Sequence, residues 1–176
     1  MEKLQRSVVE GINQLIAECR LKYGIDPRYI YEATVVCNTM MHHLILGISP
    51  KYLALSPYVP AVKGSLNLRA KELDLDVNPN INVHFLPVIA GFVGSDCVAD
   101  ILATGLSKEK DPCLLLDIGT NTEVVVGNQR RLVACSCASG PAFEGAHIKH
   151  GIKASSGAME NVRIDPDTGG VLSNDR

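Results

Sequence analysis

The sequence predicts an α/β protein with a mixed sheet and flanking helices. Residues 3–23 place apolar side chains at three- and four-residue spacing, which is typical of an amphipathic helix. Short apolar segments at 31–37 and 82–86 have the length of strands and end near Asn or Pro. Residues 113–137 then have the pattern of three consecutive strands joined by polar turns.

Composition excludes several classes of function. The chain has 176 residues, a formal net charge of −2, 5% aromatic residues and no Trp, so neither a basic surface nor a stacking platform indicates nucleic acid. The apolar segment 83–93 contains His84 and Pro87 and is too short to cross a bilayer. No signal-peptide pattern opens the chain. We therefore expect a cytoplasmic protein that binds neither nucleic acid nor membrane.

Six cysteines are scattered through apolar segments without a repeated CxxC spacing. In a reducing compartment we expect them to be small buried side chains. Cys135 and Cys137 stand two residues apart on a predicted strand and therefore share one of its faces. A soft-metal or redox role for this pair stays open.

The first helix is expected to stop at Gly24, and 31–37 is expected to form a buried strand. A short helix follows at 40–46, begun by Asn38 and Thr39. Its adjacent histidines point about 100° apart around the helix, so they cannot easily face one ligand. We expect these two residues, His42 and His43, in the core or at its rim.

Residues 48–80 are interrupted by several prolines and predict a long irregular connection with at most one short strand. After the strand at 82–86, residues 88–106 have helical periodicity. Asp96 and Asp100 would lie on one face of that helix, where two like charges disfavour it slightly. Either carboxylate could therefore have a functional role, and simple solvent exposure is the alternative.

The chain is organised around Cys113–Val126, where an apolar strand ends in Asp117 and a β-branched strand resumes after a tight polar turn. Such a turn suits a phosphate and its metal. Gly119 would let backbone N–H groups approach, Thr120 and Thr122 could donate, and Asp117 could hold Mg²⁺ directly or through water. An ordinary hairpin turn is the alternative.

A third strand at 131–137 leads into Ser139, Gly140 and Pro141, which predict the start of a helix and hence an anion site. Glu144, His147 and His150 on that helix leave metal binding open as a weaker alternative. For the tail we expect a short helix at 157–161, followed by a hairpin turned by 165–170.

Four stretches in order resemble the ATP-dependent reductive activators of corrinoid proteins, which belong to the actin, sugar-kinase and heat-shock-chaperone superfamily. The central stretches are Asp117-Ile-Gly-Thr-Asn-Thr-Glu123 and Ala134–Ala146. The others are Asn38–Gly47 and Leu86–Asp96. The resemblance covers nearly the whole chain.

This resemblance implies a partial RNase H-like, actin-like ATPase fold. Residues 1–90 would end the first ATPase lobe, and 91–176 would supply the connecting helix and the start of the second lobe. Family members bind ATP between the lobes and carry an iron–sulfur domain upstream. They return cob(II)alamin in a partner corrinoid methyl-transfer protein to cob(I)alamin. A homodimer is left open.

Residue by residue, Asp117, Gly119 and Thr120 match the superfamily's second phosphate turn. We expect these three residues to bind the nucleotide together with four others: Asn121, Thr122, Ser139 and Gly140. Asp96 matches the position of a water-orienting group and is the expected catalytic residue, while Asp117 is the expected Mg²⁺ ligand. The family usually has Gly where Cys37 stands, and Thr and Ala where Cys137 and Ser139 stand.

The sequence also leaves two alternative functions open. The first phosphate turn and the adenosine-binding segment would lie outside these residues, so we expect the fragment alone to be inactive. It could instead be a docking or structural segment. A small-molecule kinase with Asp96 as base is less favoured, because no polar sugar-binding residues surround Asp96.

Overall fold

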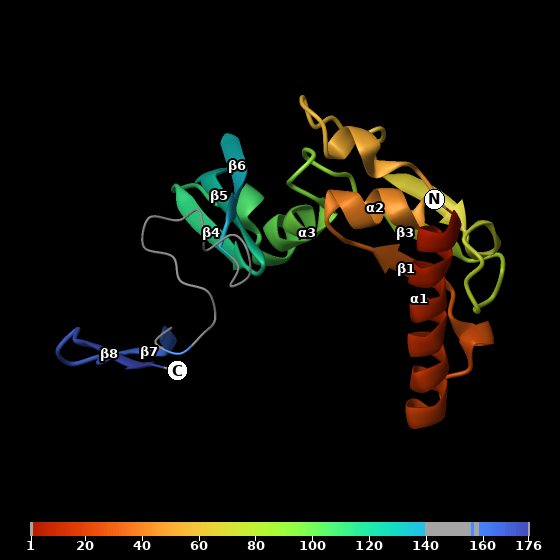
Figure 1. Ribbon diagram of the computed structural model, residues 1–176, viewed down its shortest axis with the longest axis horizontal. Helices are drawn as coiled ribbons and strands as arrows, with labels where there is room; N and C mark the ends of the chain where they lie inside the picture. The colour runs from red at the N-terminus through yellow and green to blue at the C-terminus, as the bar shows by residue number, and fades with distance from the viewer. Residues whose placement is uncertain (1, 140–155, 157–158, 176) are drawn as a thin grey trace. The chain divides into compact units, whose positions relative to one another are not determined.

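The computed structural model describes residues 2–139, 156 and 159–175 (Figure 1). The chain divides into two compact units. The first comprises Met1–Leu115 and Val125–Cys135, and the second comprises Leu116–Val124 and Ser136–Arg176. Both helices and sheets are present, as the sequence predicted.

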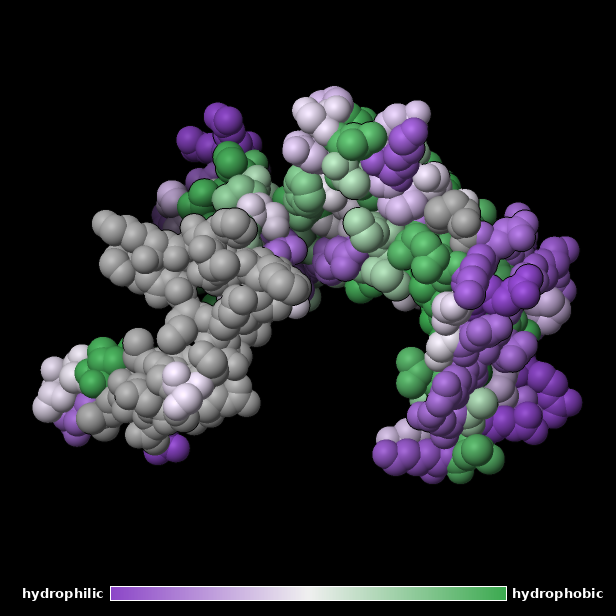
Figure 2. Space-filling model, in the orientation of Figure 1, coloured by the Kyte–Doolittle hydropathy of each residue, from purple (hydrophilic) through white to green (hydrophobic). Residues whose placement is uncertain are grey.

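Helix α1 (Glu2–Tyr23) ends as predicted, because Gly24 takes a φ of +67° and its amide donates to the Arg20 carbonyl at 2.9 Å. Most of its visible surface is hydrophilic (Figure 2). Asn13 ties the helix to the rest of the first unit. Its amide nitrogen donates to the Asp74 carbonyl at 2.9 Å, and its amide oxygen accepts from the Asp76 N–H at 2.9 Å.

The first sheet has the order β1-β3-β2, with β1 (Glu32–Val35) parallel to β3 (Asn82–Phe85) and β2 (Leu66–Arg69) antiparallel to it. The strand expected at 31–37 is confirmed at Glu32–Val35, but the expectation that it is buried is wrong. Glu32 and Thr34 are exposed, because only one face of β1 packs on the core.

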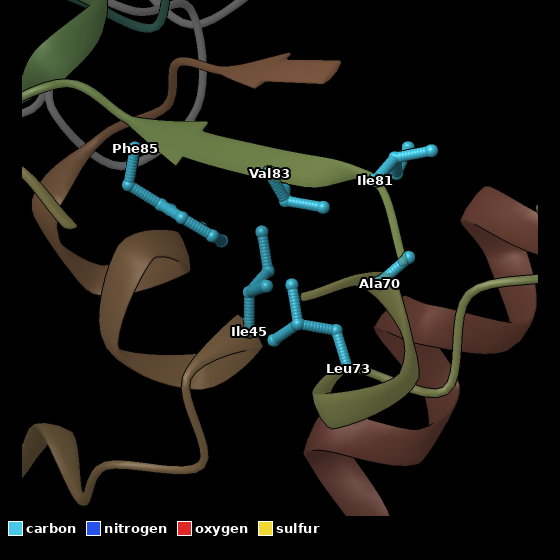
Figure 3. Packing of buried hydrophobic residues seen from close by; sticks show 6 residues of the cluster. All are labelled: Ile45, Ala70, Leu73, Ile81, Val83 and Phe85. Carbon is cyan, nitrogen blue, oxygen red and sulfur yellow. The ribbon is translucent and has the colours of Figure 1, made fainter. Parts of the chain in front are cut away.

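The main core of the first unit lies between this sheet and α2 (Thr39–Ile45) (Figure 3). Val83 and Phe85 of β3 are completely buried. Burying a side chain of this size contributes about 1.5–3 kcal/mol, so β3 is the strand on which this core depends. The cluster consists of Ile45, Ala70, Leu73, Ile81, Val83 and Phe85.

Helix α2 begins as predicted, because the Asn38 side chain accepts a hydrogen bond from the Met41 N–H at 2.9 Å. His42 and His43 are both buried, which confirms their placement in the core. His43 is fully bonded: its Nδ1 lies 2.8 Å from the Thr39 carbonyl, and its Nε2 accepts from the Ala61 N–H at 2.9 Å. In the described part of the chain neither ring nitrogen of His42 has a partner, and burial lowers the pKa of this imidazole.

Helix α3 spans Ser95–Thr104 and is shorter than the helix predicted at 88–106. Residues 88–94 are not helical. A Cβ atom on Gly94 would lie 2.6 Å from both the Cys37 carbonyl oxygen and the Asn38 Cα. This close approach to the end of β1 therefore precedes the first turn of α3.

The second sheet has the order β4 (Cys113–Ile118), β5 (Asn121–Asn128) and β6 (Arg131–Ala138), as predicted from its turns. Within the first unit, buried Val93, Cys97, Leu106 and Val125 form a second core. The expectation that all cysteines are buried is wrong, since Cys19, Cys135 and Cys137 are exposed.

Strands β7 (Met159–Ile164) and β8 (Val171–Asp175) form an antiparallel hairpin. The helix predicted at 157–161 is wrong at 159–161, which belong to β7 because they pair with β8; 157 and 158 lie outside the described residues. The predicted turn is confirmed. The Asp165 carboxylate accepts from the Asp167 and Thr168 amides, which lowers its pKa. Among the described helices, none has the length and apolar character needed to cross a membrane.

Candidate functional site

The polar turn between β4 and β5 consists of Gly119 and Thr120, and both residues are exposed. The Gly119 N–H donates to the Asn121 carbonyl at 2.9 Å, so this amide is already used within the turn. A Cβ atom on Gly119 would make only an ordinary contact, at 3.5 Å from the Asn121 oxygen. The Thr120 hydroxyl and backbone amide are therefore the groups of this turn best suited to meet an anion.

The turn is joined to the end of β6 by hydroxyl groups. Thr122, which is 8% exposed, has its Oγ1 atom 2.5 Å from the Ser139 Oγ atom. The Ser139 hydroxyl also lies 3.5 Å from the Gly119 carbonyl oxygen, and the Cys137 thiol donates to the Thr122 carbonyl at 3.3 Å. Four of the expected nucleotide-binding residues, from Gly119 to Thr122, thus stand with Ser139 in one small area.

Asp117 lies near the end of β4 on its half-buried face, whereas the neighbouring Leu116 and Ile118 are exposed. Within the described residues, no hydrogen bond or ion pair engages its carboxylate. An uncommitted carboxylate beside a polar turn fits a hard cation such as Mg²⁺. Among the residues that the structure describes, no cluster of three or more His, Cys, Asp or Glu side chains could hold a metal ion.

A polar pair that the sequence reasoning missed lies on the same strands. The Ser136 hydroxyl donates to the Glu123 carboxylate at 2.8 Å, across β5 and β6. The signal was available in principle, because residues that face each other across a short hairpin are fixed by its turn. This hydrogen bond satisfies one acceptor of the half-buried Glu123 carboxylate.

Asp96, the expected catalytic residue, belongs to the first unit, whereas the turn belongs to the second. It is the second residue of α3, and its Oδ1 atom accepts from the Cys97 N–H at 2.9 Å. The Ser95 and Asp96 amides both donate to the Cys37 carbonyl, at 3.0 and 3.4 Å. The first two amides of α3 are thus already bonded to the Cys37 carbonyl, just after β1, and offer no anion site.

Cys37 stands where the resembling family usually has Gly. Burial raises the pKa of its thiol to about 11, although a hydrogen bond with Ser95 acts in the opposite direction. The thiol is therefore protonated near neutral pH and is not an activated nucleophile. Of the expected nucleotide-binding residues, Gly140 lies outside the described residues, as do Pro141, Glu144, His147 and His150.

Two family models cover the chain. The model of the RACo middle region matches residues 1–109, and that of the C-terminal domain of RACo, the ASKHA domain, matches residues 111–174. A solved structure of a reductive activator for corrinoid, iron–sulfur protein superposes with a TM-score of 0.77 at 41% identity, covering 98% of this chain and 27% of that one. Together they confirm the predicted actin-like ATPase fold.

Curated relatives agree with this assignment. The chain is 36% identical over 162 residues to corrinoid activation enzyme RamQ of Eubacterium limosum, covering 92% of this chain and 27% of that protein. It is 33% identical over 97 residues to a Co(II) methylated amine-specific corrinoid protein reductase of Methanosarcina barkeri, covering 55% of this chain and 18% of that protein. The chain thus spans about a quarter or less of the length of these relatives. It belongs to the RACo family of reductive activators of corrinoid proteins.

Proposed function

We propose that this chain forms part of an ATP-dependent activator that helps to reduce cob(II)alamin to cob(I)alamin in a corrinoid methyl-transfer protein. Relatives named for corrinoid activation and the matching ASKHA domain support this role. Because the chain spans 27% of RamQ, the electron source would lie elsewhere, in an iron–sulfur domain upstream. ATP binding or hydrolysis would drive a conformational change that assists an unfavourable electron transfer.

Within that protein, the turn at Gly119 and Thr120 would hold a phosphate group of the nucleotide. The observation that carries this proposal is the Asp117 carboxylate, which forms no hydrogen bond or ion pair with the described residues, near a turn that is linked to Ser139 and Thr122. Asp117 would hold Mg²⁺, which would neutralise phosphate charge. Thr120 would donate to a phosphate oxygen, while Thr122 and Ser139 would keep the turn in shape.

Asp96 would orient the attacking water, since catalysis of phosphoryl transfer is mainly positioning and electrostatic stabilisation. In this proposal, residues 1–90 end the first lobe, and residues 91–176 supply the connecting helix, which carries Asp96, and the start of the second lobe, which carries Asp117. A cytoplasmic location and a homodimer stay predictions.

Nucleotide binding to the full-length protein tests the turn directly. Asp117→Ala should weaken Mg²⁺-dependent ATP binding by about tenfold or more, because it removes the metal ligand. Asp111→Ala is the matched control, since Asp111 is an exposed carboxylate just before β4, and it should leave affinity unchanged. Equal affinities for the two variants, measured by calorimetry with and without Mg²⁺, would remove Asp117 from the nucleotide site.

A further inference from the structure

The loop that leads into α3 is held at both of its ends by the junction of β1 with α2. We call this loop, residues 90–95, the approach loop. At its start, the Thr39 hydroxyl donates to the Ala90 carbonyl at 2.7 Å. At its end, the Ser95 hydroxyl bonds to both backbone groups of Cys37, at 2.9 and 3.0 Å. All of these residues belong to the first unit.

Helix α2 begins without help from the Thr39 hydroxyl. The preceding residue, Asn38, caps the helix by accepting from the Met41 N–H. Thr39 is only 1% exposed, and a hydroxyl at such a position is costly unless it is hydrogen-bonded. Valine, which is also branched at Cβ, would fill the position without that cost. The buried hydroxyl therefore serves its bond to Ala90.

Thr39 is itself fixed from within the first unit. An amide N–H can only donate, so the Nε2 atom of buried His43 accepts from the Ala61 N–H, at 2.9 Å. In the neutral ring this leaves Nδ1 as the donor to the Thr39 carbonyl, at 2.8 Å. The carbonyl and the hydroxyl of Thr39 are therefore both bonded, and a series of hydrogen bonds runs from Ala61 to Ala90.

The position of the Asp96 carboxylate depends on the approach loop. A Cβ atom on Gly94 would lie 2.6 Å from the Asp96 Oδ1 atom, so the carboxylate lies directly against the loop backbone. The same oxygen accepts from the Cys97 N–H at 2.9 Å. The loop contains two glycines, Gly91 and Gly94, whose backbones have more conformational freedom than those of other residues. A shift of this loop would therefore displace the carboxylate.

We propose that Thr39 is a positioning residue for Asp96. Its hydroxyl holds Ala90, so the approach loop keeps the carboxylate where it can orient the attacking water. This role rests on the proposed function, which assigns the orientation of water to Asp96. Catalysis by positioning is sensitive to small displacements, since a shift of about 1 Å can lower a rate about a hundredfold.

The turn within the approach loop does not depend on Thr39. The Ala90 N–H donates to the Val93 carbonyl at 2.9 Å, and the Ala90 carbonyl also accepts from the Val93 N–H, at 3.4 Å. Thr39→Val keeps the branched shape of the buried side chain and removes only the hydroxyl. We therefore expect the variant to keep its fold and the turn of the loop, and to lose the connection between the loop and α2.

ATP hydrolysis by the full-length protein tests the proposal. Thr39→Val should lower kcat about tenfold and leave ATP affinity unchanged, because the approach loop is not part of the turn that holds the phosphate. Thr39→Ser keeps the hydroxyl and should restore most of the wild-type rate. Thr104→Val is the matched control and should keep the wild-type rate. The Thr104 hydroxyl also donates to a carbonyl at 2.7 Å, that of Asp100, but at the opposite end of α3.

A double variant separates positioning from a general loss of structure. If Thr39 acts through Asp96, Thr39→Val should lower the rate no further in a protein that already carries Asp96→Asn. Two independent effects would multiply instead. A multiplied effect would therefore show that Thr39 does not act through Asp96, and the proposal would be wrong.

The outcomes distinguish this inference from the proposed function. A wild-type protein that neither binds nor hydrolyses ATP overturns both. If Asp96→Asn slows hydrolysis and Thr39→Val does not, only the positioning role is wrong. The positioning role is also wrong if Thr39→Val weakens ATP binding or if Thr39→Ser fails to restore the rate, because the residue then acts on the fold as a whole.

Discussion

The Ser95 hydroxyl accepts a hydrogen bond from the Cys37 N–H at 2.9 Å and donates one to the Cys37 carbonyl at 3.0 Å. Ser95 is completely buried, and its own amide donates to the same carbonyl at 3.0 Å. One side chain thus satisfies both backbone groups of the residue that leaves β1. This junction fixes where α3 begins and, with it, the position of Asp96 within the first unit.

Removing the Ser95 hydroxyl should therefore destabilise the folded protein. Ser95→Ala leaves the part-buried Cys37 N–H without this partner, and we expect the free energy of unfolding to fall by about 1–3 kcal/mol. Ser7→Ala is the control, because Ser7 is exposed on α1 and its hydroxyl donates to the Lys3 carbonyl of the same helix. Urea unfolding measures both. Equal losses for the two variants would show that the junction contributes nothing special.

The approach of Gly94 to the end of β1 gives a second stability prediction. Gly94→Ala would place a methyl group 2.6 Å from the Cys37 carbonyl oxygen and the Asn38 Cα, and backbone atoms cannot easily move aside. We expect a loss of about 1–3 kcal/mol. At Gly64 nothing lies within 4 Å of the added Cβ, so Gly64→Ala should be neutral or slightly stabilising. The melting temperature of each variant is the measurement. If Gly94→Ala melts at the wild-type temperature, the close approach of Gly94 to Cys37 and Asn38 is contradicted.

Buried His42 predicts a pH dependence of stability. Burial lowers its pKa in the folded protein below the ordinary value of 6.5, so the unfolded chain binds this proton first as the pH falls. Above pH 6.5, protonation of His42 therefore does not affect the free energy of unfolding. As the pH falls below that value, protonation of His42 in the unfolded chain lowers the free energy of unfolding. The free energy of unfolding, measured from pH 7.5 to 5.5, should decrease less in His42→Leu than in wild type. Met41→Leu on the same helix should keep the wild-type slope, and identical slopes in all three would contradict the prediction.

Local pattern predicted much of the fold, and contacts distant in sequence explain where it failed. Helix α1 followed from apolar spacing and Gly24 alone. The apolar period continued through 88–94, but Gly91 and Gly94 there contact backbone at Tyr58 and Cys37, which no local pattern reveals. Similarly, 159–161 became strand because a partner strand follows them.

At the candidate site, the motif located Asp117, Gly119 and Thr120 at one turn. It could not show that the Gly119 amide is already bonded to Asn121. Nor could it show the contact between Thr122 and Ser139, which are 17 residues apart. Such contacts depend on the register between β5 and β6, which the turn between the two strands fixes and which the motif alone does not give.

The hydrogen bonds that link Ser139 to Thr122 and Gly119 predict a moderate effect of Ser139 on ATP affinity. Ser139→Ala removes the contacts to Thr122 and Gly119, and we expect ATP affinity of the full-length protein to fall a few-fold, less than for Asp117→Ala. Ser136→Ala is the control, because Ser136 bonds to Glu123 on the same strands without touching the turn. Calorimetric titration with MgATP compares them. A larger effect from Ser136→Ala than from Ser139→Ala would contradict the bracing role.

The role proposed for Asp96 predicts that its substitution affects ATP hydrolysis but not ATP binding. Asp96→Asn keeps the size of the side chain and should preserve ATP affinity, while hydrolysis slows by about tenfold or more because water positioning is lost. Asp100→Asn, one helical turn further along α3, should keep the wild-type rate. Steady-state phosphate release under saturating ATP is the measurement, and an unchanged rate in Asp96→Asn would remove Asp96 from the catalytic site.

The central test is the ATP-dependent reduction of the Co(II) corrinoid protein by the full-length activator. This reduction is monitored through the absorbance of the corrinoid protein. With Asp117→Ala we expect that ATP no longer accelerates reduction, although the iron–sulfur centre is still loaded. Asp111→Ala should behave as wild type. Reduction by Asp117→Ala at the wild-type, ATP-stimulated rate would contradict the claim that this turn holds the nucleotide.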